Sequence, residues 1–281
     1  MDAFDISALS GIQTFTVNAL LIVAIFCIAA VFTVWYTCRT QIRFSQIIVG
    51  AFGYLIWIFL YSILSSSAAA SLSGIGYACF YVFLTAVTIE LVRYCITKYV
   101  LISRFHLADA AVGYALGFAG LYLLASCAVY YFSCYTTAHS YLSNGAEAFF
   151  ASLTDEEASS AYELLADLSS RSGFQILLTG VNRVFYLLRN VFLSILVWYG
   201  MTDGKQRHWL YLVPLLHVIA ILPDGLYSAG LIEDSIVSDL AVCVLSGIPI
   251  ALGAIQYRKH ENATAHYQPE KLRTRRHRGS L

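Results

Sequence analysis

A glutamate and an arginine stand three residues apart near the end of a long apolar run, at Glu90 and Arg93. Residues three apart share one face of a helix, so the carboxylate and the guanidinium can reach each other. An ionisable side chain inside a membrane costs about 2.5–3.5 kcal/mol on insertion scales and commonly marks a functional site. A carboxylate can act as a general base, and a guanidinium can stabilise an oxyanion. The pair predicts either a polar site that other helices complete or a self-neutralised structural pair.

The apolar run 174–201 carries two stripes of polar side chains. Asn182 and Arg189 are seven residues apart and share one stripe, and Arg183 and Asn190 form the stripe beside it. Side chains of this kind face protein or water rather than lipid. We therefore expect this helix to contribute binding groups to a polar interior.

The run 209–229 holds His217 and Asp224, again seven residues apart on one face. Pro214 and Pro223 interrupt the same run. A proline frees a backbone carbonyl, which a membrane tolerates only where protein or water satisfies it. The pattern predicts a kinked or broken helix that lines a cavity.

The depths of these side chains can be estimated from the helical rise of about 1.5 Å per residue across a hydrocarbon core of about 30 Å. If the three runs that carry them are neighbours, the depths predict two groups. One is a layer formed by Glu90, Arg93, Arg189 and His217, and the other is an ion pair between Asp224 and Arg183.

Membrane helices must position these residues. The 281 residues are 59% hydrophobic and only 12% charged, whereas a soluble domain averages about 25% charged. A bilayer-spanning helix needs about 20 apolar residues. The chain is predicted to be an all-α polytopic bundle with seven transmembrane helices, at 13–37, 44–65, 75–97, 108–132, 174–201, 209–229 and 236–257.

The short loops divide sharply by charge. Lysine and arginine mark cytoplasmic loops, and the other set of ends is almost entirely acidic. The pattern predicts a multi-pass protein of the cell membrane with the N-terminus outside and the C-terminus in the cytoplasm. The basic ends hold Arg39, Arg43, Lys98, Arg104, Lys205, Arg207, Arg258 and Lys259.

Residues 1–259 form one predicted transmembrane domain with a long outer loop at 133–173. Thr154 and Glu157 make a capping box, and apolar residues recur at helical spacing after it. This amphipathic helix is expected to cover the outer mouth of the bundle or to rest on the lipid surface. The polybasic tail 260–281 is expected to be disordered and attracted to anionic lipids. It has no aromatic platform, so a nucleic-acid partner is not expected.

The run 108–132 contributes glycines rather than polar groups. Gly113 and Gly117 are spaced as a small-xxx-small motif, which favours close packing of membrane helices. We therefore expect this helix to pack by its backbone against a neighbour.

The order of these pieces resembles the YhfC-like family of intramembrane proteases, distant relatives of the CAAX prenyl proteases, over about 86–229. Ile89-Glu90-Leu91-Val92-Arg93 is similar to the Glu-Glu-x-x-Arg element of that family. The glycines of 115–122 match its glycine-rich helix, and Asn182-Arg183-Val184-Phe185 resembles its Glu-Arg-Val-Phe helix. Leu215-Leu216-His217 resembles its last element, a helix with His and Asp.

Several positions depart from the family pattern. Ile89 replaces the glutamate usually assigned to water activation. The other departures are Phe118 and Tyr122 for His and Glu, Asn182 for Glu, Asn190 for His, and Ile221 for Asp.

The resemblance implies Glu90 as the base and His217 or Arg93 as the oxyanion stabiliser. Glu90 and His217 are two metal ligands where about three are needed, so neither a metal nor another cofactor is expected. The favoured interpretation is a degraded or repurposed relative. If the chain is active, it is an intramembrane peptidase whose substrate is a transmembrane peptide.

Two other readings stay open. Arg93, Arg183 and Arg189 outnumber Glu90 and Asp224, which favours a membrane carrier or receptor for a small anion. A seven-helix receptor or rhodopsin fits the topology less well. Its last run has no lysine for a retinal Schiff base, and the stretch 90–94 has two residues too many for the receptor Glu-Arg-Tyr motif.

Overall fold

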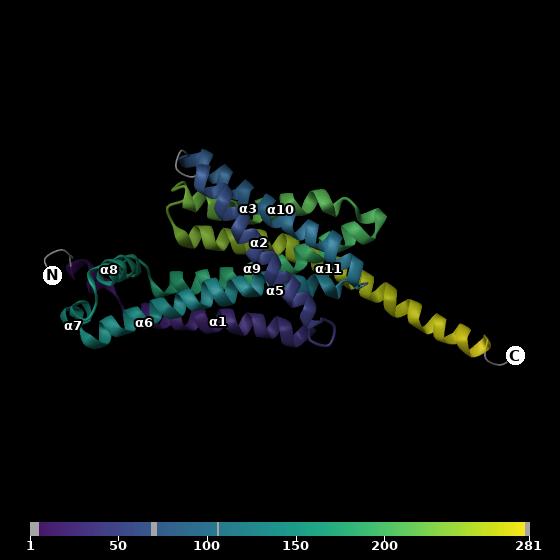
Figure 1. The fold of residues 1–281 in the computed structure, drawn as a ribbon, viewed down its shortest axis with the longest axis horizontal. Helices are drawn as coiled ribbons and strands as arrows, with labels where there is room; N and C mark the ends of the chain where they lie inside the picture. The colour runs from purple at the N-terminus through teal and green to yellow at the C-terminus, as the bar shows by residue number, and fades with distance from the viewer. Residues whose placement is uncertain (1–5, 69–71, 106, 279–281) are drawn as a thin grey trace.

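The computed structural model describes residues 6–68, 72–105 and 107–278, and all regular structure in these ranges is helical (Figure 1). Seven segments of this part are long and apolar enough to cross a membrane. They overlap the seven predicted spans, which confirms the fold class, but the fourth continues to Asn144, into the segment predicted as the start of the outer loop. The segments are Thr14–Cys38, Phe44–Ser66, Gly74–Arg104, Asp109–Asn144, Gly173–Thr202, Gly204–Ser228 and Ser235–His260.

The first four spans follow a short 3₁₀ turn, η1 (Ile6–Gly11). The third and fourth spans each contain a π-helical stretch, and π-bulges are frequent at functional sites. The elements are α1 (Thr14–Cys38), α2 (Phe44–Ala68), α3 (Gly74–Ile96), η3 (Thr97–Leu101), α4 (Ile102–Arg104), α5 (Asp109–Leu121), η4 (Tyr122–Ala128) and α6 (Val129–Asn144).

The remaining elements begin with two short helices at one end of the bundle and continue with the last three spans (Figure 1). They are α7 (Ala146–Ala151), α8 (Asp155–Ser169), α9 (Gly173–Thr202), η5 (Gly204–Gln206), α10 (Trp209–Ser228) and α11 (Ser235–Arg278). Neither Pro214 nor Pro223 interrupts α10, so the helix is not broken, and the kink that the prolines also predicted stays a prediction.

Helix α9 is the centre of the bundle. It packs against α1, α5, α10 and α11 and also touches α3, while α3 and α10 pack on each other. Its second half is buried almost throughout. The three helices that carry the charged intramembrane residues, α3, α9 and α10, are therefore neighbours, as the layer prediction requires.

The predicted close packing of the glycine-rich helix is between α5 and α2. A Cβ added at Gly117 would lie 1.9 Å from the carbonyl oxygen of Ile47, and one added at Gly50 would lie 1.9 Å from that of Tyr114. The two backbones are in contact at this crossing. Glycine is required here because any side chain would push the helices apart.

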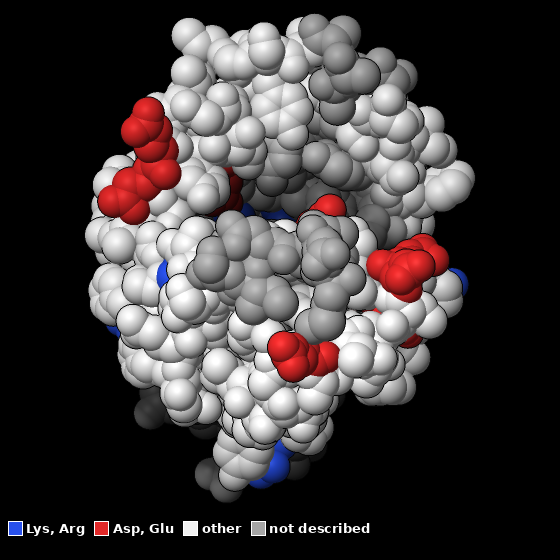
Figure 2. Space-filling model, turned by 90° about the vertical axis from the view of Figure 1, so that its left-hand side faces the viewer, with Lys and Arg blue, Asp and Glu red and all other residues white. Residues whose placement is uncertain are grey.

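The two ends of the bundle differ in charge. We call the end that holds α7, α8 and the start of α11 the acidic end, and Figure 2 shows acidic side chains around it. We call the opposite end, with Arg39, Lys98, Lys205 and Arg258, the basic end. Which end faces the cytoplasm stays a prediction from the charge pattern.

The predicted capping box is formed at the start of α8. The Thr154 hydroxyl oxygen accepts from the Glu157 backbone N–H, and the Glu157 carboxylate accepts from the Thr154 backbone N–H at 3.0 Å. The buried face of α8 packs on η1 and α6. The helix thus rests on one side of the acidic end, and Figure 2 shows a hollow in that end.

The capping box should make α8 sensitive to acid. The backbone N–H of Thr154, and then its hydroxyl, hold the pKa of Glu157 below its ordinary value of 4.5. Because the folded pKa is the lower one, this stabilisation is present above the ordinary value and is lost as the pH falls through the folded pKa. Hydrogen exchange, corrected for intrinsic rates, should show α8 opening in that range. Thr154→Ala, which removes a cap worth roughly 1 kcal/mol, should open α8 at neutral pH and weaken the pH dependence.

Helix α11 continues through the polybasic segment to Arg278, beyond the predicted end of the last span at residue 257. The expectation that this tail is disordered and held by anionic lipids stays a prediction.

Candidate functional site

Four polar side chains from three helices meet inside the bundle. Oε1 of Glu90 accepts a hydrogen bond from Nη1 of Arg93 and lies 2.5 Å from Nδ1 of His217. Nη2 of Arg93 donates to Oδ1 of Asn190. All four residues are at most 5% exposed. We call Glu90, Arg93, Asn190 and His217 the Glu90 cluster.

The Glu90 cluster follows from the local spacing on each helix. Glu90 and Arg93 lie one helical turn apart on α3, and α10 brings His217 to the same carboxylate oxygen. Asn190 is held by a bond from its Nδ2 to the carbonyl oxygen of Tyr186, 2.9 Å away and one turn earlier on α9. With Glu90 ionised, His217 donates from Nδ1 and its Nε2 is the acceptor.

The Glu90 cluster is not fully paired. Oε2 of Glu90, Nε of Arg93 and Nε2 of His217 are buried and make no hydrogen bond with the described residues. A buried network whose members are partly satisfied carries the desolvation cost of each unpaired group. These three atoms can therefore accept or donate one further hydrogen bond each to a bound group.

Arg189 does not join the Glu90 cluster. Its Nη1 donates to Oγ of Ser246 on α11 at 3.0 Å, with the carbonyl oxygen of Ala220 on α10 at 3.5 Å. Successive residues on a helix point about 100° apart. Because α9 turns Asn190 towards α3, its neighbour Arg189 points towards α10 and α11. Three of the four residues predicted for this layer come together, and the fourth lies beside them.

Asn182 binds a residue that the sequence reasoning missed. Its Nδ2 donates to Oδ1 of Asp239 on α11 at 2.5 Å, and the hydroxyl of Thr179 donates to Oδ2 at 2.8 Å. Asp239 is 8% exposed. The signal was present, because Asp239 is an acidic residue inside an apolar run and stands seven residues before Ser246, the partner of Arg189.

The predicted ion pair between Asp224 and Arg183 is wrong. Nη1 of Arg183 donates to the hydroxyl of Tyr122 at 3.2 Å, and the ion pairs among the described residues do not include Asp224. Arg183 points to the fourth span at η4, whereas Asp224 lies on α10. With Asp239 counted, the intramembrane arginines no longer outnumber the carboxylates, which removes the charge surplus on which the anion hypothesis rested.

A groove on the outer wall of the bundle leads to the Glu90 cluster. It has a volume of about 250 Å³ and lies between α3 and α10. Leu91 at its rim is 54% exposed, so the groove opens on the side that faces lipid. We call it the α3–α10 groove, and its lining is Val87, Glu90, Leu91, Tyr94, Val197, Leu210 and Pro214.

Glu90 and His217 are both metal-ligand side chains, so the site can be tested for a metal. A catalytic zinc needs about three protein ligands, and the described residues hold no group of three or more His, Cys, Asp or Glu side chains suited to a metal. The cation beside Oε1 of Glu90 is the guanidinium of Arg93. The donor set of the Glu90 cluster therefore does not fit a catalytic metal.

A family model described as YhfC intramembrane metalloprotease matches the chain over residues 21–242. No curated protein and no solved structure matches the chain. The matched region includes α3, α9 and the Glu90 cluster, and it covers well over half of the 281 residues. The chain therefore belongs to the YhfC intramembrane metalloprotease family.

Proposed function

We propose that this chain is a repurposed member of the family, which binds a membrane-embedded polypeptide segment without hydrolysing it. The main observation in support of this proposal is that Arg93 and His217 both contact Oε1 of Glu90 inside a buried cluster. Arg93 and His217, the two groups that could stabilise an oxyanion, thus both contact Glu90, the carboxylate that the family resemblance implies as the base. Ile89, buried beside them, offers no second carboxylate.

The family name implies a metal, and the donor set at the Glu90 cluster does not fit one. No step is therefore assigned to a metal. Hydrolysis would need a base that activates water beside an oxyanion donor. Arg93 keeps an unpaired Nε that could donate, but Oε1 of Glu90 is already held by Arg93 and His217. The structure supports a binding role for this cluster better than a catalytic one.

The α3–α10 groove supports a polypeptide as the bound segment. Glu90 lines this groove, and its Oε2 is a buried acceptor that no described residue satisfies. Pro214 has no N–H to donate to the carbonyl oxygen of Leu210, which also lines the groove. Acceptors in hydrocarbon need donors. An acyl chain has none, whereas a peptide segment supplies backbone N–H and hydroxyl groups together with apolar side chains.

The experiment uses the full chain in vesicles with single-pass membrane peptides. We expect no cleavage by the wild type, by Glu90→Gln or by His217→Ala. We expect a peptide to bind the wild type and to bind Leu91→Trp roughly tenfold more weakly, equivalent to about 1.4 kcal/mol, because the larger ring fills the groove. Leu55→Trp is the matched control, since Leu55 is 51% exposed on α2, away from the groove.

Two results would contradict this proposal. Cleavage by the wild type that disappears in both Glu90→Gln and His217→Ala would establish an active peptidase. Equal loss of peptide binding in Leu91→Trp and Leu55→Trp would mean that the groove is not the binding site.

A small anion is the second candidate ligand, and Arg189 is the observation that favours it. This guanidinium is 2% exposed, belongs to no ion pair among the described residues, and has an unpaired Nε. A thermal shift caused by small carboxylates or phosphate, and abolished by Arg189→Ala, would support this alternative.

A further inference from the structure

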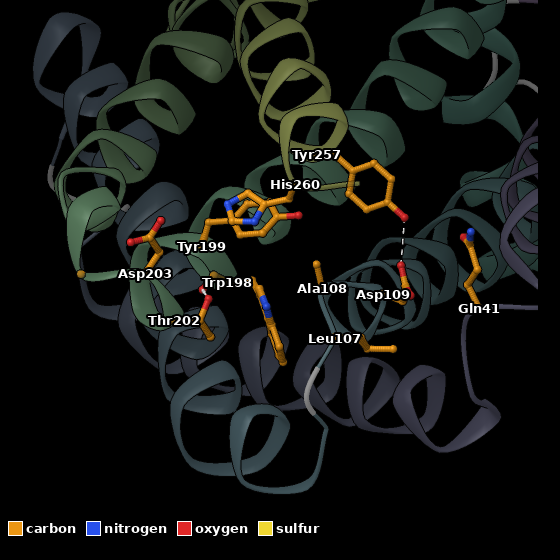
Figure 3. Close-up of a pocket in the computed structure, with 11 residues that line it drawn as sticks. Gln41, Leu107, Ala108, Asp109, Trp198, Tyr199, Thr202, Asp203, Tyr257 and His260 are labelled. Atoms are coloured by element: carbon orange, nitrogen blue, oxygen red, sulfur yellow. Dashed lines mark hydrogen bonds between the residues drawn. The ribbon is translucent and has the colours of Figure 1, made fainter. Parts of the chain in front are cut away.

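A second cavity lies at the basic end, away from the Glu90 cluster. Its volume is about 480 Å³, and it is formed where α5 begins and where α9 and the membrane-spanning part of α11 end (Figure 3). Its walls include two carboxylates, Asp109 and Asp203, and the rings of Trp198, Tyr199 and Tyr257. Neither the family match nor the proposed function uses these residues.

The charge of this cavity is opposite to that of its surroundings. The ends of the spans here are rich in lysine and arginine. Apart from Glu261 and Glu270 in the C-terminal segment, the acidic residues near this end are Asp109 and Asp203. Both of them line the same cavity. Figure 3 shows Trp198 and Tyr199 between the two carboxylates. An acidic, aromatic cavity inside a basic rim suits a ligand that carries both signs of charge.

Two polar groups in the cavity have capacity for a ligand. Oδ1 of Asp109 accepts from the hydroxyl of Tyr257 at 2.9 Å, and its Oδ2 makes no hydrogen bond with a described residue. Trp198 also lines the cavity and is only 3% exposed, and the buried unpaired polar atoms among the described residues do not include its indole N–H. Oδ2 of Asp109 can accept a hydrogen bond from a ligand, and the N–H of Trp198 can donate one. The ring of His260 stacks on Tyr199 at 4.0 Å and closes one side of the cavity.

We propose that this cavity binds the ammonium group of a zwitterionic phosphodiester, such as an ethanolamine headgroup. Charge-assisted bonds to Asp109 and contact with aromatic faces recognise the ammonium. The Trp198 N–H receives a phosphate or ester oxygen. Lys205 and Lys259 are exposed and adjoin the cavity residues Gly204 and His260 in the chain, and their charge attracts the phosphate. The cavity lies at the ends of three spans, at the level where tryptophan and tyrosine meet lipid headgroups.

The test measures binding to the full chain purified in detergent. The probes are short-chain phosphatidylethanolamine, phosphatidylglycerol, which has no ammonium, and free phosphoethanolamine. Asp109→Asn keeps an acceptor for Tyr257 but removes the charge, and it should weaken binding of the ethanolamine lipid roughly tenfold. Asp155→Asn is the matched control, because Asp155 also lies in the first turn of a helix, α8, at the other end of the bundle.

A second variant keeps the test decisive if Asp109→Asn does not fold. Trp198→Phe retains a ring but removes the N–H, and it should weaken binding of the ethanolamine lipid several-fold. Binding of the lipid but not of free phosphoethanolamine identifies a membrane lipid as the ligand. Equal binding of both identifies the headgroup alone, and either result supports the cavity. Equal affinity for phosphatidylglycerol and phosphatidylethanolamine, or unchanged affinity in both variants, would overturn the proposal. Peptide binding at the α3–α10 groove is measured separately, so failure of the lipid proposal is distinguishable from failure of the proposed function.

Discussion

Glu90→Gln should lower the free energy of unfolding by about 3–5 kcal/mol, because it leaves the buried charge of Arg93 uncompensated. Arg93 is 1% exposed and donates to Glu90 and Asn190. The amide of a glutamine cannot supply the negative charge that Arg93 and His217 share. Denaturant titration in mixed micelles measures the effect. Glu147→Gln, at an exposed glutamate of α7, should change stability by no more than about 0.5 kcal/mol.

A double-mutant cycle tests whether the loss comes from the pair. Arg93→Met alone should also be costly, because it leaves the Glu90 carboxylate buried with only His217 as partner. The combined variant should lose less than the sum of the two single variants, by at least about 1 kcal/mol. Additive losses, or a Glu90→Gln protein as stable as the wild type, would show that the pairing of Glu90 with Arg93 does not stabilise the protein.

Gly117→Ala should cost about 3 kcal/mol, the upper part of the range for overpacked cores. Its Cβ would lie 1.9 Å from the carbonyl oxygen of Ile47 and 2.9 Å from the backbone nitrogen of Ala51. These are backbone atoms of α2, so no side-chain rotation can relieve the clash. The helices must separate, and thermal unfolding in micelles should show the loss.

Gly247→Ala is the matched control for this prediction. Gly247 is also inside a membrane helix, α11, but an added Cβ would meet no heavy atom within 4 Å. Alanine has a higher helix propensity than glycine by up to about 1 kcal/mol, so this variant should be as stable as the wild type or slightly more stable. Equal stability of Gly117→Ala and Gly247→Ala would mean that α2 and α5 are not in backbone contact.

The α2–α5 contact also supports the Glu90 cluster. From α2, Nε1 of Trp57 donates to the hydroxyl of Thr88 on α3 at 3.1 Å, two residues before Glu90. Phe118 on α5 packs its ring against Tyr54 and Trp57. A shift of α2 in Gly117→Ala should therefore change the fluorescence of the tryptophans as well as the stability.

The amino-acid pattern was enough to predict the helices and the short-range geometry. Runs of about 20 apolar residues give membrane helices because the bilayer leaves no other way to pair the backbone. A spacing of three residues on one helix brings Glu90 and Arg93 together whatever lies around them. The capping box of Thr154 and Glu157 is equally local. These features could be predicted because they depend on the geometry of a single helix.

Which side chains meet across helices depends on how the helices pack in three dimensions. The period of α9 shows that Arg189 and Asn190 lie on adjacent stripes, but packing determines which stripe faces α3. The backbone contact at Gly50 and Gly117 sets the position of α2 against α5. Arg183 pairs with Tyr122 rather than Asp224, and Asp239 binds Asn182, for the same reason. The rotation of a helix about its own axis is set by all of its neighbours together, and no stretch of one helix contains that information.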